Sequence, residues 1–314
     1  MSLIPLLAIV GPTASGKTAL SLEICKQIGG EVVSADSMQI YKGISVASAA
    51  PTKAEMQGIK HHLIEFLNPE DSFSVSDYVL AAKQKIEEIN NRGKRAVLVG
   101  GTGLYVDSLT NGITFQNSGK CNAELRSKLT TKLNTVGAKA MLCELSQIDP
   151  LTAARLHEND HKRIIRAFEV YLSTGLTVTQ QNELSKKTPS PYKTVLVGVN
   201  YKNRETLYKR INTRVESMVA SGLIEEAKAT LNLNKGGGAL QAIGHKELYP
   251  YINGEISLDE AVENLKRSTR RYAKRQITWF GKNPQIHWIY MDECENPVSA
   301  VMDILKGENY FEAY

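Results

Sequence analysis

The chain has 314 residues and a formal net charge of +5, because 38 Lys and Arg side chains outnumber 33 Asp and Glu side chains. Hydrophobic residues make up 42% and charged residues 23% of it, which indicates a folded protein of one large or two modest domains and excludes a disordered or low-complexity chain. The small excess of positive charge permits a polyanionic partner without requiring one.

Four scattered cysteines and one apolar segment bear on the cellular compartment. No two cysteines form a Cys-x-x-Cys pair, so we expect neither a disulfide framework nor a thiolate zinc site, and a reducing cytoplasm fits best. The apolar run 3–10 lacks a basic leader and contains Pro5. We therefore interpret it as a buried strand rather than as a secretion signal or a membrane span.

Apolar strand patterns alternate with helical patterns through much of the chain. Buried parallel strands are predicted at residues 6–10, 31–35, 95–99 and 194–199, with a last short strand at 285–290. Helices are predicted at residues 18–28, 74–91, 203–233 and 257–280, and the second and fourth begin with the capping boxes Ser74–Asp77 and Ser257–Glu260. This alternation predicts an α/β fold with a parallel sheet flanked by helices, in which ligands gather at the carboxyl ends of the strands.

The strand signal is missing between residues 121 and 190. This stretch is typical of several helices, broken at Gly137, Pro150, Asn159 and Gly175. We therefore expect a helical insertion at residues 121–190, placed within a core that residues 1–120 and 191–314 form together.

A phosphate-binding loop follows the first predicted strand and precedes the first predicted helix. It matches the pattern G-x-x-x-x-G-K-[ST] and consists of Gly11, Pro12, Thr13, Ala14, Ser15, Gly16, Lys17 and Thr18. In such a loop the backbone N–H groups face the phosphates, the lysine adds a positive charge and the Thr18 hydroxyl can bind Mg²⁺. The pattern predicts that a di- or triphosphate binds there together with Mg²⁺.

The loop alone does not say which phosphate compound binds. A nucleotide hydrolase of this fold carries a strand that ends in Asp or Glu, whereas the strand ending at Val99 runs into Gly100, Gly101 and Thr102. The guanine-reading pattern N-K-x-D is also missing, because glycines follow Asn234-Lys235. A GTPase is thereby excluded, while a small-molecule kinase that uses ATP remains an alternative.

Asp36 follows the second predicted strand and should lie at the carboxyl edge of the sheet, close to the phosphate loop. Position alone leaves three roles open for it. It could act as a general base, as a turn or cap residue, or as a partner of a Mg²⁺ ligand.

Six segments together resemble the bacterial tRNA dimethylallyltransferases, also called tRNA isopentenyltransferases. They are GPTASGKT (11–18), DSMQIYKG (36–43), GGTGLY (100–105), DHKRIIRAFEVY (160–171), QAIGHKE (241–247) and AKRQITWF (273–280), and they span nearly the whole chain. The resemblance implies transfer of a dimethylallyl group from dimethylallyl diphosphate to the exocyclic N6 amine of the adenine 3′ to the tRNA anticodon. It also implies that the loop holds this donor rather than ATP and that Mg²⁺ assists the leaving diphosphate. We expect the enzyme to act as a monomer.

The resemblance also implies roles for individual residues. Asp36 would take the proton of the adenine amine, Thr102 would contact the acceptor nucleotide and Arg214 would grip the diphosphate. The other residues implied to contact tRNA are Ser37, Met38, Gln39, Arg126, Asp160, His161, Lys162, Arg163, Ile164, Gln241, Ala242, Ile243, Gly244, His245 and Lys246.

Two segments depart from the family pattern. Residues 47–52 read ASAAPT where the family is close to GTAKPT, so a glycine and a lysine are lost. His245 stands where the related motif has tyrosine, so a contact through the phenol is in doubt, although a neutral histidine could still stack on a base.

Basic side chains recur at helical spacing along the last long predicted helix, where we expect one positive stripe: Lys266, Arg267, Arg270, Arg271, Lys274 and Arg275. A second cluster comprises His161, Lys162, Arg163 and Arg166. On periodicity alone such faces are usually just solvated, and it is the resemblance that favours RNA binding.

The segment from His157 to His161 matches H-E-x-x-H, a zinc-protease signature that needs both histidines on one continuous helix. We interpret Asp160 as the N-cap of a new helix, which separates the two histidines and argues against zinc.

Besides a kinase, two further alternatives remain open. A prenyltransferase acting on free adenine nucleotides would prefer AMP to tRNA. A non-enzymatic RNA-binding protein would bind tRNA without binding the donor in the presence of Mg²⁺, although the intact pair Lys17-Thr18 argues against it.

Overall fold

The structure, a computed structural model, describes residues 3–113, 123–187, 189–231 and 238–312. The chain divides into two compact units. One comprises Met1–Thr110 together with Pro191–Tyr314, and the other comprises Asn111–Ser190. They are called here the core unit and the insertion unit, and each is described by itself.

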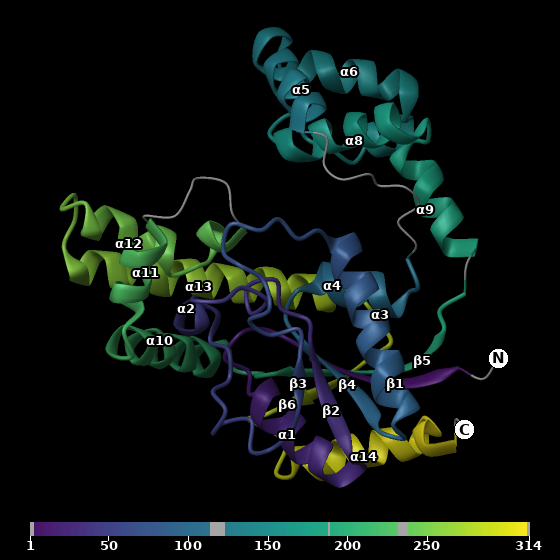
Figure 1. Cartoon of the computed structure of the whole chain (residues 1–314), viewed down its shortest axis with the longest axis vertical. Helices are drawn as coiled ribbons and strands as arrows, with labels where there is room; N and C mark the ends of the chain where they lie inside the picture. Colours follow the sequence, from purple (N-terminus) through teal and green to yellow (C-terminus); the bar gives the residue numbers. More distant parts are fainter. Residues whose placement is uncertain (1–2, 114–122, 188, 232–237, 313–314) are drawn as a thin grey trace. The chain divides into compact units, whose positions relative to one another are not determined.

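A parallel sheet with the strand order β3-β2-β4-β1-β5-β6 lies at the centre of the core unit (Figure 1). Its strands are β1 (Ile4–Val10), β2 (Gly30–Ser34), β3 (His61–His62), β4 (Arg95–Gly100), β5 (Tyr192–Asn200) and β6 (Ile286–Tyr290). Val10 pairs with both Gly100 and Gly198, so the carboxyl ends of β4 and β1 are level at one edge, and β5 continues to Asn200. The predicted α/β fold is confirmed.

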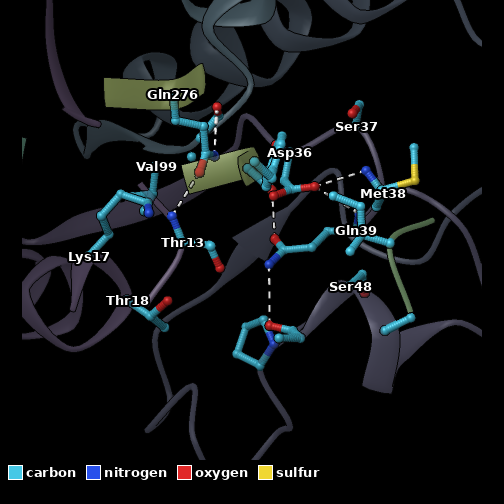
Figure 2. Close-up of a pocket in the computed structure, with 18 of the residues that line it drawn as sticks. Thr13, Lys17, Thr18, Asp36, Ser37, Met38, Gln39, Ser48, Val99 and Gln276 are labelled. Atoms are coloured by element: carbon cyan, nitrogen blue, oxygen red, sulfur yellow. Dashed lines mark hydrogen bonds between the residues drawn. The ribbon is translucent and has the colours of Figure 1, made fainter. Parts of the chain in front are cut away.

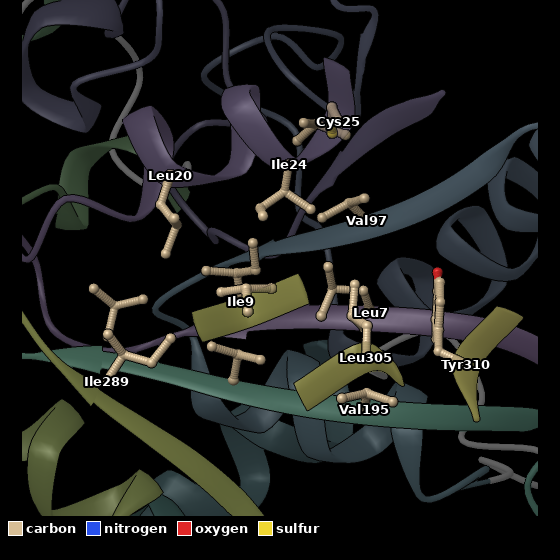
Figure 3. Close-up of a cluster of buried hydrophobic side chains, with 14 residues drawn as sticks. Leu7, Ile9, Leu20, Ile24, Cys25, Val97, Val195, Ile289, Leu305 and Tyr310 are labelled. Atoms are coloured by element: carbon tan, nitrogen blue, oxygen red, sulfur yellow. The ribbon is translucent and has the colours of Figure 1, made fainter. Parts of the chain in front are cut away.

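One face of the sheet is covered by α1 (Lys17–Ile28) and α14 (Pro297–Gly307) (Figure 3). Successive side chains of a strand point to opposite faces, so Leu7 and Ile9 of β1 both reach this cluster. There they pack with Ile24 of α1 and Leu305 of α14. This packing holds the start of α1, and with it the phosphate loop, against the end of β1.

The helix α3 (Val75–Asn91) packs on β2, β4 and α4 (Gly103–Thr110). The predicted capping box is present at its start, since Ser74 and Asp77 bind each other's backbone N–H groups. The Tyr78 hydroxyl donates to the carbonyl of Ser34 at 3.1 Å, and its ring stacks on Tyr105 of α4 with 3.9 Å between centroids. These contacts fasten the end of β2 just before Asp36.

The helices after β5 are α10 (Arg204–Ala220), α11 (Leu223–Leu231), α12 (His245–Ile252) and α13 (Leu258–Phe280). The single helix predicted at 203–233 is wrong, because Gly222 takes a φ of 96° and separates α10 from α11. Only half of the second predicted capping box forms, in which Ser257 Oγ accepts from the backbone N–H of Glu260 at 3.2 Å.

The insertion unit contains the helices α5 (Ala123–Val136), α6 (Ala138–Ile148), α7 (Pro150–Ala153), α8 (His161–Thr174) and α9 (Val178–Lys187). Gly137, Pro150 and Gly175 each lie at a helix boundary, as the sequence predicts. The unit has its own apolar core, built from Leu129, Leu133, Met141, Leu145, Ile164, Ile165, Ala167 and Phe168.

Glu31 anchors the amino-terminal half of β2. Only 3% of it is exposed, and its carboxylate contacts His62 Nε2 at 2.7 Å, Arg92 Nη2 at 2.7 Å and Lys94 Nζ at 2.9 Å. Desolvation alone would raise the pKa of this carboxyl. The hydrogen bonds from His62 and Lys94, with the charges of Arg92 and Lys94, prevail and lower the pKa to about 2.

We expect Glu31→Gln to destabilise the protein by about 2 kcal/mol at pH 7, because the buried carboxylate and its contacts with His62, Arg92 and Lys94 are lost. A carboxyl with a lowered folded pKa stabilises above its unfolded pKa of about 4.3, and that stability is lost as the pH falls toward 2. The deficit of the variant should therefore shrink below pH 4.3. Urea unfolding at pH 7 and pH 3 measures it, with the exposed Glu23→Gln on α1 as control, and an equal deficit at both pH values would contradict this account.

Candidate active site

The phosphate loop, residues 11–18, joins β1 to α1. Gly11 has a φ of 139° and lies so close to the carbonyl of Val199 that a Cβ would overlap it. Gly16, with a φ of 98°, is the N-cap of α1. Both positions need glycine, and they turn the chain so that Lys17 and Thr18 begin the helix, where the free N–H groups and the helix dipole favour an anion.

Lys17 is held inside this loop. Its Nζ donates to the carbonyl of Pro12 at 2.6 Å. Desolvation and the positive charge of Arg214 lower the pKa of Lys17 to about 7, and the negative charge of Asp36 offsets only part of this effect. The ammonium is therefore poorly stabilised by the protein, which suits a group that binds an anion.

Asp36 lies just past the end of β2 and lines the same pocket as Lys17 (Figure 2). Its Oδ1 accepts from the backbone N–H of Met38 at 2.8 Å and from that of Gln39 at 3.4 Å. The turn therefore orients the carboxylate. One of the three roles left open, that of a turn residue, is observed, and it is compatible with chemistry at the carboxylate.

Arg214 reaches the pocket from α10. Desolvation lowers the pKa of its guanidinium, while the negative charges of Asp36 and Glu55 act in the opposite direction. Lys17, Asp36 and Arg214 thus come from three separate parts of the sequence and share one pocket, with two cations and one carboxylate facing the same space.

Gln276 of α13 connects the phosphate loop to the end of β4. Its Oε1 accepts from the backbone N–H of Thr13 at 2.8 Å, and its Nε2 donates to the carbonyl of Gly101 at 2.9 Å (Figure 2). The side chain is only 5% exposed, and a Cβ on Gly101 would overlap its Nε2. No motif in the sequence marks Gln276 as a site residue. The feature that could have indicated its role is an uncharged polar residue among the apolar, inward-facing positions of a basic helix.

Thr102 joins the ends of β4 and β2. Its backbone N–H donates to the carbonyl of Ala35 at 3.1 Å, and its Oγ1 accepts from the backbone N–H of Ser37 at 3.0 Å. The structure thus brings Thr102 beside the Asp36 turn, whose orientation it helps to fix. A contact between Thr102 and an acceptor nucleotide stays a prediction.

The pocket has a volume of about 320 Å³ and lies entirely within the core unit. Thr13, Lys17 and Thr18 line it at the phosphate loop, and Ser37, Met38 and Gln39 line it beside Asp36. Its remaining walls include apolar side chains from several elements: Val32, Ala47, Ala49, Pro51, Ile64, Val99, Val215, Met218 and Ile243. A polar, cationic end and apolar walls suit a ligand with a diphosphate and a hydrocarbon group.

Some residues of the segment 241–246 line the pocket, and others are buried in the protein interior. Ile243 and Lys246 line the pocket, whereas Ala242 is buried. His245 is fully buried and contacts Glu226, so its ring is not available to stack on a base, the contact that the sequence left open for it. Gly244 takes a φ of 121° just before α12; Gln241 ends η1 (Gly238–Gln241), and its side chain lies outside the described residues.

Residues 160–164 of the insertion unit include both exposed and buried side chains. His161, Lys162 and Arg163 are exposed, and Asp160 stands at the N-cap position, although its Oδ2 accepts from the backbone N–H of His157. Ile164 is 0% exposed within the apolar core of the unit, so a tRNA contact through its side chain is wrong.

Arg126 and the segment 157–161 of the insertion unit were also predicted to bear on function. Arg126 pairs with the buried Glu169 at 3.4 Å and keeps nearly half of its side chain exposed. His157 precedes α8 whereas His161 begins it, and within the described residues no group of three His, Cys, Asp or Glu side chains could hold a metal ion.

The basic stripe of α13 is narrower than the sequence predicts. Lys266 pairs with Glu216 at 2.8 Å and Glu263 at 3.0 Å, and Arg270 donates to Asn212 at 2.7 Å. The side chains that remain exposed are Arg267, Arg271, Lys274 and Arg275. Across the ranges that the structure describes, no helix is long and apolar enough to cross a membrane.

Fold and pocket together define an α/β protein with a phosphate loop at the carboxyl edge of a parallel sheet. The model of one family, IPP transferase, matches residues 39–283. Because this match covers most of the chain, the chain belongs to the IPP transferase family.

Two relatives are similar over nearly their whole length. The chain is 45% identical over 293 residues to a tRNA dimethylallyltransferase of Caldanaerobacter subterraneus, covering 92% of this chain and 93% of that protein. It is 43% identical over 288 residues to the tRNA dimethylallyltransferase of Bacillus subtilis, covering 91% of each.

Two solved structures are similar as well. One is the full-length tRNA isopentenylpyrophosphate transferase of Bacillus halodurans, with a TM-score of 0.71, 39% identity and coverage of 98% of this chain and 99% of that one. The other is a eukaryotic dimethylallyltransferase acting on tRNA, with a TM-score of 0.82, 26% identity and coverage of 98% of this chain and 79% of that one.

We expect Gln276→Glu to lower stability by about 2 kcal/mol, because a carboxylate oxygen would face the carbonyl of Gly101 in a buried position. Thermal unfolding at pH 7 measures the effect, and the exposed Gln285→Glu introduces the same charge as a control. Equal melting temperatures for the two variants would show that the contacts of Gln276 do not hold the two loops together.

Proposed function

We propose that this chain transfers a dimethylallyl group from dimethylallyl diphosphate to the N6 amine of an adenine next to the tRNA anticodon. The observation that carries the proposal is the convergence of Lys17, Arg214 and Asp36 in one pocket with apolar walls. Two cations suit a diphosphate, and a carboxylate suits an amine that must lose a proton. The names of the relatives support the same reaction on tRNA.

The diphosphate of the donor would lie at the amino end of α1. Backbone N–H groups of the phosphate loop, the ammonium of Lys17 and the planar guanidinium of Arg214 would bind its oxygens. These groups act on negative charge, which increases on the diphosphate as the C–O bond breaks. They therefore stabilise the transition state more than the ground state.

Magnesium fits this site. The hydroxyl of Thr18 lines the pocket beside Lys17, and Mg²⁺ usually keeps several waters and takes its other ligands from phosphate oxygens and one or two protein groups. We propose Thr18 as its protein ligand. When bound, the ion would supply further positive charge to the leaving diphosphate.

Asp36 would act on the acceptor. The exocyclic amine of adenine is a poor nucleophile because its lone pair is delocalised into the ring. As N6 forms a bond to C1 of the dimethylallyl group, the C1–O bond breaks, diphosphate leaves with the electron pair, and Asp36 takes the proton from N6. The turn N–H groups of Met38 and Gln39 hold the carboxylate in place for this step.

A base that reacts in this pocket must leave the stack of the anticodon loop. We propose that Ser37, Met38, Gln39 and Thr102 contact the flipped adenine, and that Ile243 and Lys246 contact tRNA at the other wall. The exposed Arg267, Arg271 and Lys274 on α13, and in the insertion unit His161, Lys162 and Arg163, would bind backbone phosphates.

We also propose that the protein acts as a monomer in the cytoplasm. Cys25, Cys143 and Cys294 are free thiols, which is consistent with a reducing compartment.

Lys17→Ala should weaken binding of dimethylallyl diphosphate roughly a hundredfold, because a desolvated charge facing the diphosphate is removed. Lys26→Ala, an exposed lysine on the same helix, is the control. Calorimetric titration of the donor in the presence of Mg²⁺ gives the dissociation constants, and an unchanged constant for the Lys17 variant would rule out this role of the loop.

Asp36→Asn should lower kcat at least about a hundredfold while donor affinity changes less than about twofold, because its contact is with the acceptor. Asparagine keeps an Oδ1 acceptor for the N–H of Met38, so the turn should persist. The exposed Asp303→Asn serves as control. Steady-state kinetics with tRNA separate the two parameters, and a normal kcat combined with weak donor binding would refute the assignment.

A further inference from the structure

The helix α2 (Ser45–Ser48) has no N-terminal cap of its own. Its N-cap residue is Ile44, whose side chain cannot accept a hydrogen bond, although the first N–H groups of a helix lack partners within the helix. Glu226 of α11 supplies the missing acceptors. Its Oε2 accepts from the backbone N–H of Val46 and its Oε1 from that of Ala47, both at 2.8 Å.

His245 holds Glu226 in place. Its Nε2 lies 2.9 Å from Glu226 Oε1, and its Nδ1 lies 3.2 Å from Thr230 Oγ1. The histidine is 0% exposed and the Glu226 side chain 10% exposed, so these contacts are shielded from water. One carboxylate therefore joins three partners, two in α2 and one at the start of α12.

Both segments that meet at Glu226 are walls of the pocket. Ala47 and Ser48 of α2 and its C-cap residue Ala49 line it, and Ile243 and Lys246 line it on either side of His245. Glu226 and His245 do not line the pocket themselves, and no hydrogen bond among the described residues connects them to the phosphate loop. Their effect on a ligand must therefore pass through these walls.

A further contact extends from α2 toward the Asp36 turn. Gln39 Nε2 donates to the carbonyl of Ala49 at 3.4 Å, and Gln39 Oε1 accepts from Ser34 Oγ at 2.8 Å (Figure 2). The backbone N–H of Gln39, like that of Met38, also donates to Asp36. The position of α2 is thus tied both to the apolar wall and to the carboxylate.

We propose that Glu226 and His245 are a positioning pair that sets the α2 wall against the hydrocarbon group of the donor. The inference rests on the proposed function, because it takes a prenyl diphosphate as the ligand. The pair determines where the methyl groups of Ala47 and Ala49 and the ring of Pro51 stand, while the phosphate loop binds the diphosphate independently. Loss of the pair should weaken recognition of the hydrocarbon and spare recognition of the diphosphate.

Three variants test this pair. Glu226→Gln keeps the shape but turns an amide N–H₂ toward one of the peptide N–H groups. His245→Met removes the ring N–H, whereas His245→Gln, of similar size, keeps a donor that can reach Glu226. Each variant is titrated calorimetrically with dimethylallyl diphosphate and with inorganic diphosphate in the presence of Mg²⁺, and its thermal unfolding is recorded.

We expect Glu226→Gln and His245→Met to bind dimethylallyl diphosphate roughly tenfold more weakly than the unchanged protein, and inorganic diphosphate within about twofold of it. His245→Gln should recover most of the lost affinity. A merely structural role would lower the melting temperature without changing the ratio of the two affinities.

Three results would overturn the inference. They are unchanged affinity for dimethylallyl diphosphate in both damaged variants, an equal loss of affinity for both ligands, and failure of His245→Gln to recover more than His245→Met. If the unchanged protein binds dimethylallyl diphosphate no more tightly than inorganic diphosphate, the proposed donor is wrong. The inference about the positioning pair is then wrong too, because it takes that donor as the ligand.

Discussion

The parallel register of β2, β4 and β1 is the constraint on which the site depends. Because Ser34 pairs with Val99 and Val10 pairs with Gly100, these strands end at one edge and deliver the Asp36 turn, the Gly101–Thr102 turn and the phosphate loop to the same place. The loops can approach closely because Gly100 leaves room for the carbonyl of Ala35. Their short separation lets a single side chain, Gln276, bridge two of them.

The positive charges in the pocket are only partly balanced by the protein, so the pocket favours an anion. Lys17 and Arg214 are both desolvated and repel each other, and Asp36 compensates only in part. At the other end of β2 the situation is reversed, since the Glu31 carboxylate is fully surrounded by cationic and histidine partners. The charges at the amino end of β2 therefore stabilise the fold, whereas the charges near its carboxyl end favour ligand binding.

Local patterns were sufficient to predict much of this architecture. The phosphate loop, the capping box at Ser74 and the helix boundaries at Gly137 and Gly175 follow from residue types at fixed spacing, which act within a few residues. What could not be predicted depends on contacts distant in sequence. The strand β3 has two residues and is defined by its pairing with Val32 and Val33, and the buried His245 contacts Glu226, which lies in another helix.

The most direct test is mass spectrometry of tRNA digests after the protein is incubated with tRNA, dimethylallyl diphosphate and Mg²⁺, beside reactions in which AMP replaces tRNA or ATP replaces the donor. The account predicts prenylated adenosine in tRNA and none in AMP. Prenylated AMP with unmodified tRNA would contradict it and indicate a free-nucleotide prenyltransferase. Consumption of ATP without any prenyl product would instead indicate a kinase.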